Sequence, residues 1–144
     1  MQENQNVKVL NEVYKGAKMG VGTISYMLPK INNTALKKDL ANQMLGYHNF
    51  VKSSSKSLHN VHHYPSDPGP LTKIPAYSAL MLKTSIDSSD GHIAEMMIGE
   101  ATSSIVSITK MLNKNKNLTT EAATIGNDII AFEQSNIDRL RQYL

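Results

Sequence analysis

Four stretches of this sequence place apolar or small residues three and four positions apart, which is the spacing of one face of an α-helix. The stripes cover 10–28, 36–61, 92–112 and 122–144. Each is long enough for a helix of several turns, and the 144 residues are about the size of one domain with one core. The sequence therefore predicts a single all-α domain over 1–144, a four-helix bundle of up-down-up-down type.

Residues that start and stop helices lie at the ends of these stripes. Pro29 and the asparagines that follow it predict the end of the first helix, and Asn33 or Thr34 is placed to cap the second. Thr119 or Thr120 marks the start of the last helix. The short loop before the second helix favours two antiparallel neighbours.

The stretch 64–89 is harder to interpret. Three prolines within 64–70 indicate a loop. Pro75 is suited to the first turn of a helix, and apolar residues continue to Ile86 before the polar run 87–91 interrupts them. We therefore expect a short extra helix before the third long one, followed by a break.

Composition excludes several classes of protein. No stretch approaches the ~18 uninterrupted apolar residues of a membrane span, so we expect no membrane partner. Residues 1–8 lack the apolar core of a secretory signal, which favours an intracellular, cytoplasmic protein. The absence of cysteine excludes disulfides, thiolate nucleophiles and zinc sites built on sulfur.

The formal net charge is +3, but the lysines are spread over several segments and interleaved with acids elsewhere. We therefore expect no nucleic-acid partner. The methionines are ordinary core residues on this reading, with one exception. Met96 falls roughly opposite the inward stripe of its helix, and an exposed methionine there would indicate a dimer face.

Three segments carry a resemblance to a known superfamily. The stretches 14–24, 92–99 and 132–140 resemble small ferritin-like four-helix-bundle proteins of Gram-positive bacteria. The resemblance spans nearly the whole chain and implies a ferritin-like bundle. Metal-binding members of the superfamily use one Glu on each of two helices and a Glu-x-x-His pair on each of the other two, all pointing inward.

These ligand motifs are degenerate here. On the second helix Gln43 occupies the inward position, and Gly46 stands where the histidine belongs. On the fourth helix Glu133 points inward, but Asn136 replaces the histidine. On the first helix Glu12 faces water, and on the third long helix Glu95 and Glu100 fall at opposite flanks of the stripe. One inward carboxylate is too few for two hard metal ions, so we expect no cofactor.

Glu133 still predicts a buried polar site, because an acid on an apolar stripe must be hydrogen-bonded, paired or protonated. Gln43 and Tyr47 are the inward polar groups of the second helix that could reach it, with His48 a further candidate, and Asn136 lies one turn away. A satisfied polar network that sets helix register is one interpretation. A remnant ligand site is the other.

Histidines supply weaker metal candidates. His59 and His62 are three residues apart, next to His63, and His92 has the same spacing to Glu95. Nothing in the sequence brings a third ligand to either pair. Histidines near a helix C-terminus also interact favourably with its dipole, which favours a surface role.

These observations lead to two hypotheses. The first is a non-enzymatic ferritin-like bundle that acts through protein association, as a homodimer burying methionine-rich helix surface. The second is a metal-dependent ferritin-like oxidoreductase or metal-binding protein, with iron, manganese or zinc in an irregular site around Glu133. No Ser, His and acid are brought together by a motif that would support nucleophilic catalysis.

Overall fold

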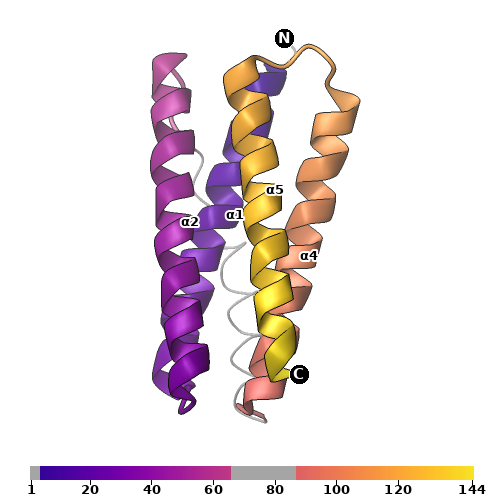
Figure 1. Ribbon diagram of the computed structural model, residues 1–144. Helices are drawn as coiled ribbons and strands as arrows, with labels where there is room; N and C mark the ends of the chain where they lie inside the picture. The colour runs from indigo at the N-terminus through magenta and orange to yellow at the C-terminus, as the bar shows by residue number, and fades with distance from the viewer. Residues whose placement is uncertain (1–3, 66–86) are drawn as a thin grey trace.

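The computed structural model describes residues 4–65 and 87–144, which form four long α-helices and no strand (Figure 1). Helix α1 spans Gln5–Met27, α2 Thr34–Asn60, α4 Asp90–Lys114 and α5 Thr120–Leu140, with 3₁₀ turns at Leu28–Lys30 and Arg141–Tyr143. The all-α prediction is confirmed for these residues. The short helix expected over 75–86 lies outside them.

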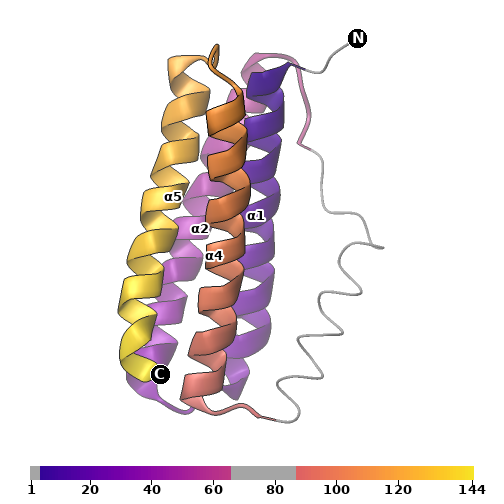
Figure 2. The same ribbon diagram turned by 90° about the vertical axis from the view of Figure 1, so that its right-hand side faces the viewer.

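The expected up-down-up-down order is wrong, because α2 and α4 run in the same direction (Figures 1 and 2). Asn33, which caps α2, donates to the Asp90 carboxylate at the start of α4 over 2.9 Å, so both helices begin at the same end of the bundle. At the opposite end the Thr119 amide before α5 donates to Asn6 in the first turn of α1. The connection between α2 and α4 therefore joins opposite ends, whereas the other two connections join neighbouring ends. Residue spacing within the helices does not contain this information.

Each helix begins at a polar side chain that accepts a hydrogen bond from the first turn. Asn33 accepts from the amides of Ala35 and Leu36, and Thr119 accepts from Ala122. These are two of the four candidate caps. Helix α4 begins two residues earlier than its stripe indicated, because Ser89 provides the cap.

The core runs the length of the bundle and is formed by the predicted stripes. Its buried side chains include Val13, Ala17, Ile24, Leu36, Leu40, Ile93, Met97, Ile108, Ile129 and Leu140. Met96 also packs against this core and is half-buried, so the expectation that it falls opposite the inward stripe is wrong. Among the described residues no helix is both long and apolar enough to cross a membrane.

A hydrogen bond and an ion pair hold the C-terminal turn and the end of α5 against the start of α2. The Tyr143 hydroxyl donates to one carboxylate oxygen of Asp39 over 2.6 Å, and Arg139 contacts the other at 3.3 Å. Asp39 is itself only 9% exposed. Both carboxylate oxygens of this buried acid on α2 therefore have a partner, one in α5 and one in the turn that follows α5.

We expect Tyr143→Phe to lower the free energy of unfolding by about 1 kcal/mol, since it removes one hydrogen bond to a charged acceptor. Urea denaturation followed by circular dichroism measures this. Tyr64→Phe is the matched control, because Tyr64 is 83% exposed and should tolerate the change. Equal stabilities of the two variants would contradict this role for the Tyr143 hydroxyl.

Candidate functional site

Glu133 lies in the middle of the bundle and is 2% exposed. Its place in the α5 stripe points its carboxylate at the core, as the sequence predicted. Asn136 is one turn further along the same face and is 7% exposed. These two residues form the α5 side of a buried polar cluster.

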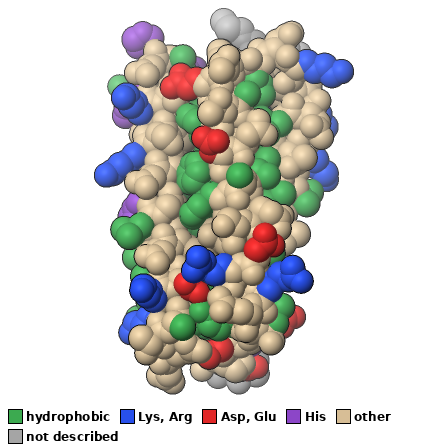
Figure 3. Space-filling model, in the orientation of Figure 1, with side chains coloured by type: hydrophobic (Ala, Val, Ile, Leu, Met, Phe, Trp, Pro, Cys, Tyr) green, Lys and Arg blue, Asp and Glu red, His purple; other side chains and the backbone are tan. Residues whose placement is uncertain are grey.

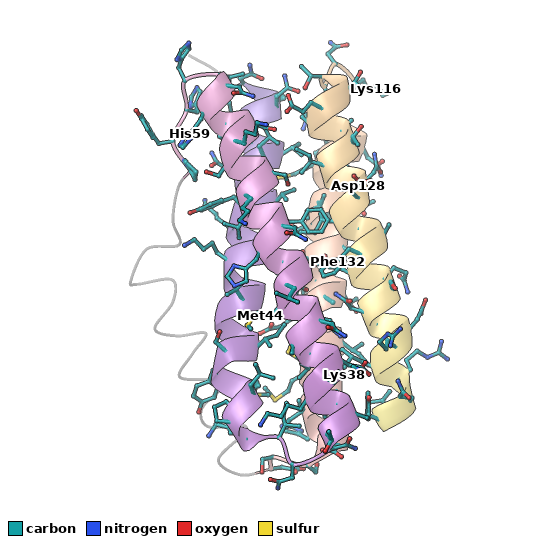
Figure 4. The ribbon with its side chains drawn as sticks, turned by 60° about the vertical axis from the view of Figure 1, so that its left-hand side comes forward. Lys38, Met44, His59, Lys116, Asp128 and Phe132 are labelled. Atoms are coloured by element: carbon teal, nitrogen blue, oxygen red, sulfur yellow. The ribbon has the colours of Figure 1, made fainter. Side chains whose placement is uncertain are left out.

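Helix α2 supplies the other two predicted members. Tyr47 is 4% exposed, and its hydroxyl donates to the Oε1 atom of Glu133 over 3.3 Å. The edge of its ring meets Phe132 with the centroids 5.0 Å apart, in the seam between α2 and α5 (Figure 4). Gln43 lies one turn before Tyr47 and is also 4% exposed. The structure thus places Gln43, Tyr47, Glu133 and Asn136 in the interior, on two facing helices.

Close packing with α1 holds the Tyr47 ring in place. A Cβ built on Gly20 would come within 2.7 Å of that ring, closer than real Cβ atoms approach. Gly20 therefore allows the ring to lie directly against the α1 backbone. This contact accounts for a glycine inside a helix, where it costs about 0.8–1 kcal/mol relative to alanine.

Helices α4 and α1 contribute groups that the sequence analysis placed elsewhere or left out. Ser104 of α4 lies beside Glu133 and favours the charged form of its carboxyl, which lowers its pKa. Glu100, one turn earlier on α4, accepts a hydrogen bond from Thr23 of α1 over 3.4 Å and interacts electrostatically with Glu133. All four long helices thus contribute to the cluster or its border.

Burial raises the pKa of Glu133 from its ordinary 4.5 to about 7. Ser104 and the hydrogen bond from Tyr47 stabilise the charged form and limit the shift, while the negative charge of Glu100 adds to it. Burial, and then the charge of Glu133, also raise the pKa of the Tyr47 hydroxyl. Near neutral pH the Glu133 carboxyl therefore exchanges a proton, whereas Tyr47 stays protonated.

The cluster contains three buried polar atoms with no hydrogen-bond partner among the described residues. They are the amide nitrogens of Gln43 and Asn136 and the Oε2 atom of Glu133. Polar atoms that are buried in this way ordinarily bond to a neighbouring group or to water. The arrangement can hold a proton on Glu133 near neutral pH.

The donor set does not fit a pair of hard metal ions. Of the two carboxylates near the centre, only Glu133 is buried, and Glu100 lies at the exposed border. Gln43 and Asn136 contribute neutral amides. A di-metal centre needs several ionised oxygens to offset its charge.

The other predicted candidates lie away from the cluster. His48 is exposed on α2, so its inclusion in the buried site was wrong. His59 and His62 are exposed at the end of α2, where the His59 ring packs against Tyr64. The remaining pair, His92 and Glu95, lies near the start of α4. The side chain of Glu95 is exposed, and the Nε2 atom of His92 is buried with no hydrogen-bond partner among the residues that the structure describes. In 4–65 and 87–144 no three His, Asp or Glu side chains converge as a metal site would require.

Glu100, Ser104 and Thr23 are the members that sequence reasoning missed. A weak signal existed, because Glu100 and Ser104 are four residues apart and so share one face of α4. That face lies at the flank of the apolar stripe. Only the packing of α4 against α1 shows that it borders the cluster.

Compared with known proteins, the sequence matches no family model, and neither the curated proteins nor the solved structures contain a significant match to it.

Proposed function

We propose that this protein is a non-enzymatic ferritin-like helical bundle that acts through association with other protein chains, a second copy of itself first among them. The observation that carries the proposal is the make-up of the central cluster. Amides, hydroxyls and one carboxyl with a pKa of about 7 occupy the place where a metal-dependent bundle would need ionised oxygens.

Two features of the fold support the ferritin-like assignment. Ferritin-like bundles differ from simple up-and-down bundles by one long crossover connection. Here α2 and α4 run parallel, so their connection joins opposite ends of the bundle (Figure 2). The cluster also draws on all four helices, as a ferritin-like centre does, with Gln43 and Asn136 at positions that would otherwise carry metal ligands.

Light scattering coupled to size-exclusion chromatography tests the association. We expect a species heavier than the 15.9 kDa monomer at the higher protein concentrations. A monomer at every concentration would count against self-association.

Metal binding around Glu133 is the second candidate function, as the site of a metal-binding protein or an oxidoreductase. The Oε2 atom of Glu133 has no hydrogen-bond partner within 4–65 and 87–144, and the nearby charge of Glu100 opposes the ionisation of Glu133. A cation between the two carboxylates would stabilise both. Elemental analysis of protein purified without chelator separates the two functions. Under the first proposal we expect iron, manganese and zinc far below one per chain, and a stoichiometric metal that Glu133→Gln removes would favour the second.

A further inference from the structure

The side of α2 that faces solvent carries positive charge and no acid. The exposed residues of this helix are four lysines, two histidines and three asparagines, with Thr34, Ala35 and Leu45. Every polar side chain in this set can donate a hydrogen bond. This side of α2 therefore suits a ligand that is anionic and rich in hydrogen-bond acceptors.

Five of the basic side chains form a narrow strip along the outside of α2. At about 100° per residue they fall within an arc of about 80°, roughly opposite the buried side of the helix. The α2 strip consists of Lys38, His48, Lys52, Lys56 and His59. Lys38 lies near the start of α2 and His59 near its end (Figure 4), so the strip is about 31 Å long at about 1.5 Å per residue. Lysine and histidine side chains line the outer edge that α2 forms (Figure 3).

The positive charge of the strip is not neutralised by the described part of the chain. Within 4–65 and 87–144, none of its three lysines forms an ion pair. Residues 4–65, which contain α1 and α2, carry eight lysines against two acids, a net formal charge of +6. Both acids are already bonded elsewhere, because Glu12 accepts from Ser107 of α4 and Asp39 pairs with Arg139 of α5.

The acids of α5 lie on a different side of α2 from the strip. Glu121 accepts a hydrogen bond from Ser57, which marks the side of α2 that faces α5. Ser57 is about 100° around the helix from Lys56 and about 140° from Lys52. A ligand on the strip therefore meets the lysines of α2 before it meets the acids of α5.

The composition of this surface distinguishes between classes of anionic partner. Protein interfaces have centres rich in aromatic residues and methionine, whereas the exposed residues of α2 include no Phe, Tyr, Trp or Met. A helix that lies on a membrane buries its apolar face in the lipid, but the apolar face of α2 lies in the core of the bundle. Interfaces with nucleic acid are more polar and much more positively charged than interfaces with protein. Composition therefore favours nucleic acid.

The length of the strip and its residue types favour a duplex. A strip of about 31 Å is close to one helical turn of duplex DNA, about 34 Å, so along the duplex axis it crosses both phosphate backbones. Sites for single strands add aromatic side chains on which bases stack, and α2 exposes none of Phe, Tyr and Trp. Arginine, the commonest reader of guanine, is absent from α2. Contacts to phosphates rather than to bases are therefore expected.

We propose that the α2 strip binds the phosphate backbone of double-stranded DNA without reading its sequence. Lys38, Lys52 and Lys56 supply the charge, and the two histidines add hydrogen-bond donors. We expected no nucleic-acid partner from lysines spread along the sequence, but the helix aligns these three on one side and both acids of 4–65 are bonded to other helices. This inference goes beyond the proposed protein association and does not depend on it.

Fluorescence anisotropy of a labelled DNA duplex, titrated with the full chain, provides the test. A duplex of about 20 base pairs gives the strip about two helical turns on which to bind. At low salt we expect saturable binding that is the same for unrelated base sequences. Three phosphate contacts predict a slope of about −2.7 for log Kobs against log salt, so binding should weaken about 40-fold between about 50 and 200 mM salt.

K52Q/K56Q removes two of the three lysines of the strip. At about 50 mM salt we expect it to weaken binding at least about tenfold, and to reduce the salt slope by about 2. K110Q/K114Q is the matched control, because it removes the same charge from exposed lysines of α4, across the bundle from α2 (Figure 1). The control should weaken binding by less than about threefold, since it changes only the long-range attraction. All four lysines are exposed, so both variants should fold, which circular dichroism checks.

Several results would overturn the inference. Absence of binding at low salt would do so, and so would equal losses in the two double variants, since net charge alone would then explain the attraction. Tighter binding to a single strand, to poly-glutamate or to vesicles of phosphatidylcholine and phosphatidylserine, at equal concentrations of negative charge, would overturn the duplex as the ligand. Light scattering measures self-association separately, so a failure of either proposal leaves the other standing.

Discussion

Between pH 5 and pH 8 the free energy of unfolding should fall by about 2.5 kcal/mol on account of Glu133 alone, and Glu133→Gln should abolish this loss. The carboxyl has a pKa of 4.5 in the unfolded chain and about 7 in the folded protein. The folded state therefore binds the proton more tightly across this interval. Stability is highest below the unfolded pKa, declines as pH rises through the folded pKa, and levels off above it.

The measurement is urea denaturation at a series of pH values, with the difference between the variant and the unmodified protein as the quantity of interest. Glutamine keeps the shape of the side chain and an oxygen that can accept from Tyr47. We expect Glu133→Gln to be the more stable protein at pH 8. Glu95→Gln is the matched control, because it removes a carboxyl that is exposed. If Glu133→Gln and the unmodified protein lose stability in parallel, the buried carboxyl does not titrate in this range.

Gly20→Ala should destabilise the protein by up to about 2 kcal/mol, although alanine is the better helix former. The added Cβ would come within 2.7 Å of the Tyr47 ring, which is buried and bonded through its hydroxyl to Glu133. Forcing an extra carbon into a packed core costs about 1–3 kcal/mol. The gain in helix propensity, about 1 kcal/mol, offsets only part of this cost.

Gly99→Ala is the control for this prediction. Gly99 is exposed in the middle of α4, and no atom of the described residues lies within 4 Å of the Cβ position. We expect the same substitution to stabilise the protein here by about 0.5–1 kcal/mol. The two variants should therefore shift the urea midpoint in opposite directions, and a stabilising Gly20→Ala would contradict the close packing of Tyr47 against α1.

Much of the fold followed from local patterns in the sequence. The apolar stripes predicted all four long helices, and the candidate caps included Asn33 and Thr119, because capping depends on side chains within one turn. The direction of α4 did not follow. A helix buries the same apolar stripe whether it runs parallel or antiparallel to its neighbour, so the spacing of apolar residues does not predict the direction of α4.

The candidate site was also predicted only in part. Glu133, Asn136, Gln43 and Tyr47 were predicted because each lies on the inward stripe of its own helix. His48, next to Tyr47, proved exposed, since neighbouring residues on a helix point about 100° apart. The position of Met96 was misjudged, and the closeness of Glu100 to Glu133 was missed, for a related reason. Flanking positions of a stripe are covered by an adjacent helix or left open depending on how the helices pack.

The sequence by itself determined the four helices, most of their ends and the inward acid of α5, because these depend on residues within a turn or two of each other. Only the tertiary structure decided that α2 and α4 run parallel and that Glu100 and Ser104 border Glu133. These features arise from contacts between residues far apart in the chain, such as Asn33 with Asp90 and Ser57 with Glu121, and periodicity within one helix carries no information about them.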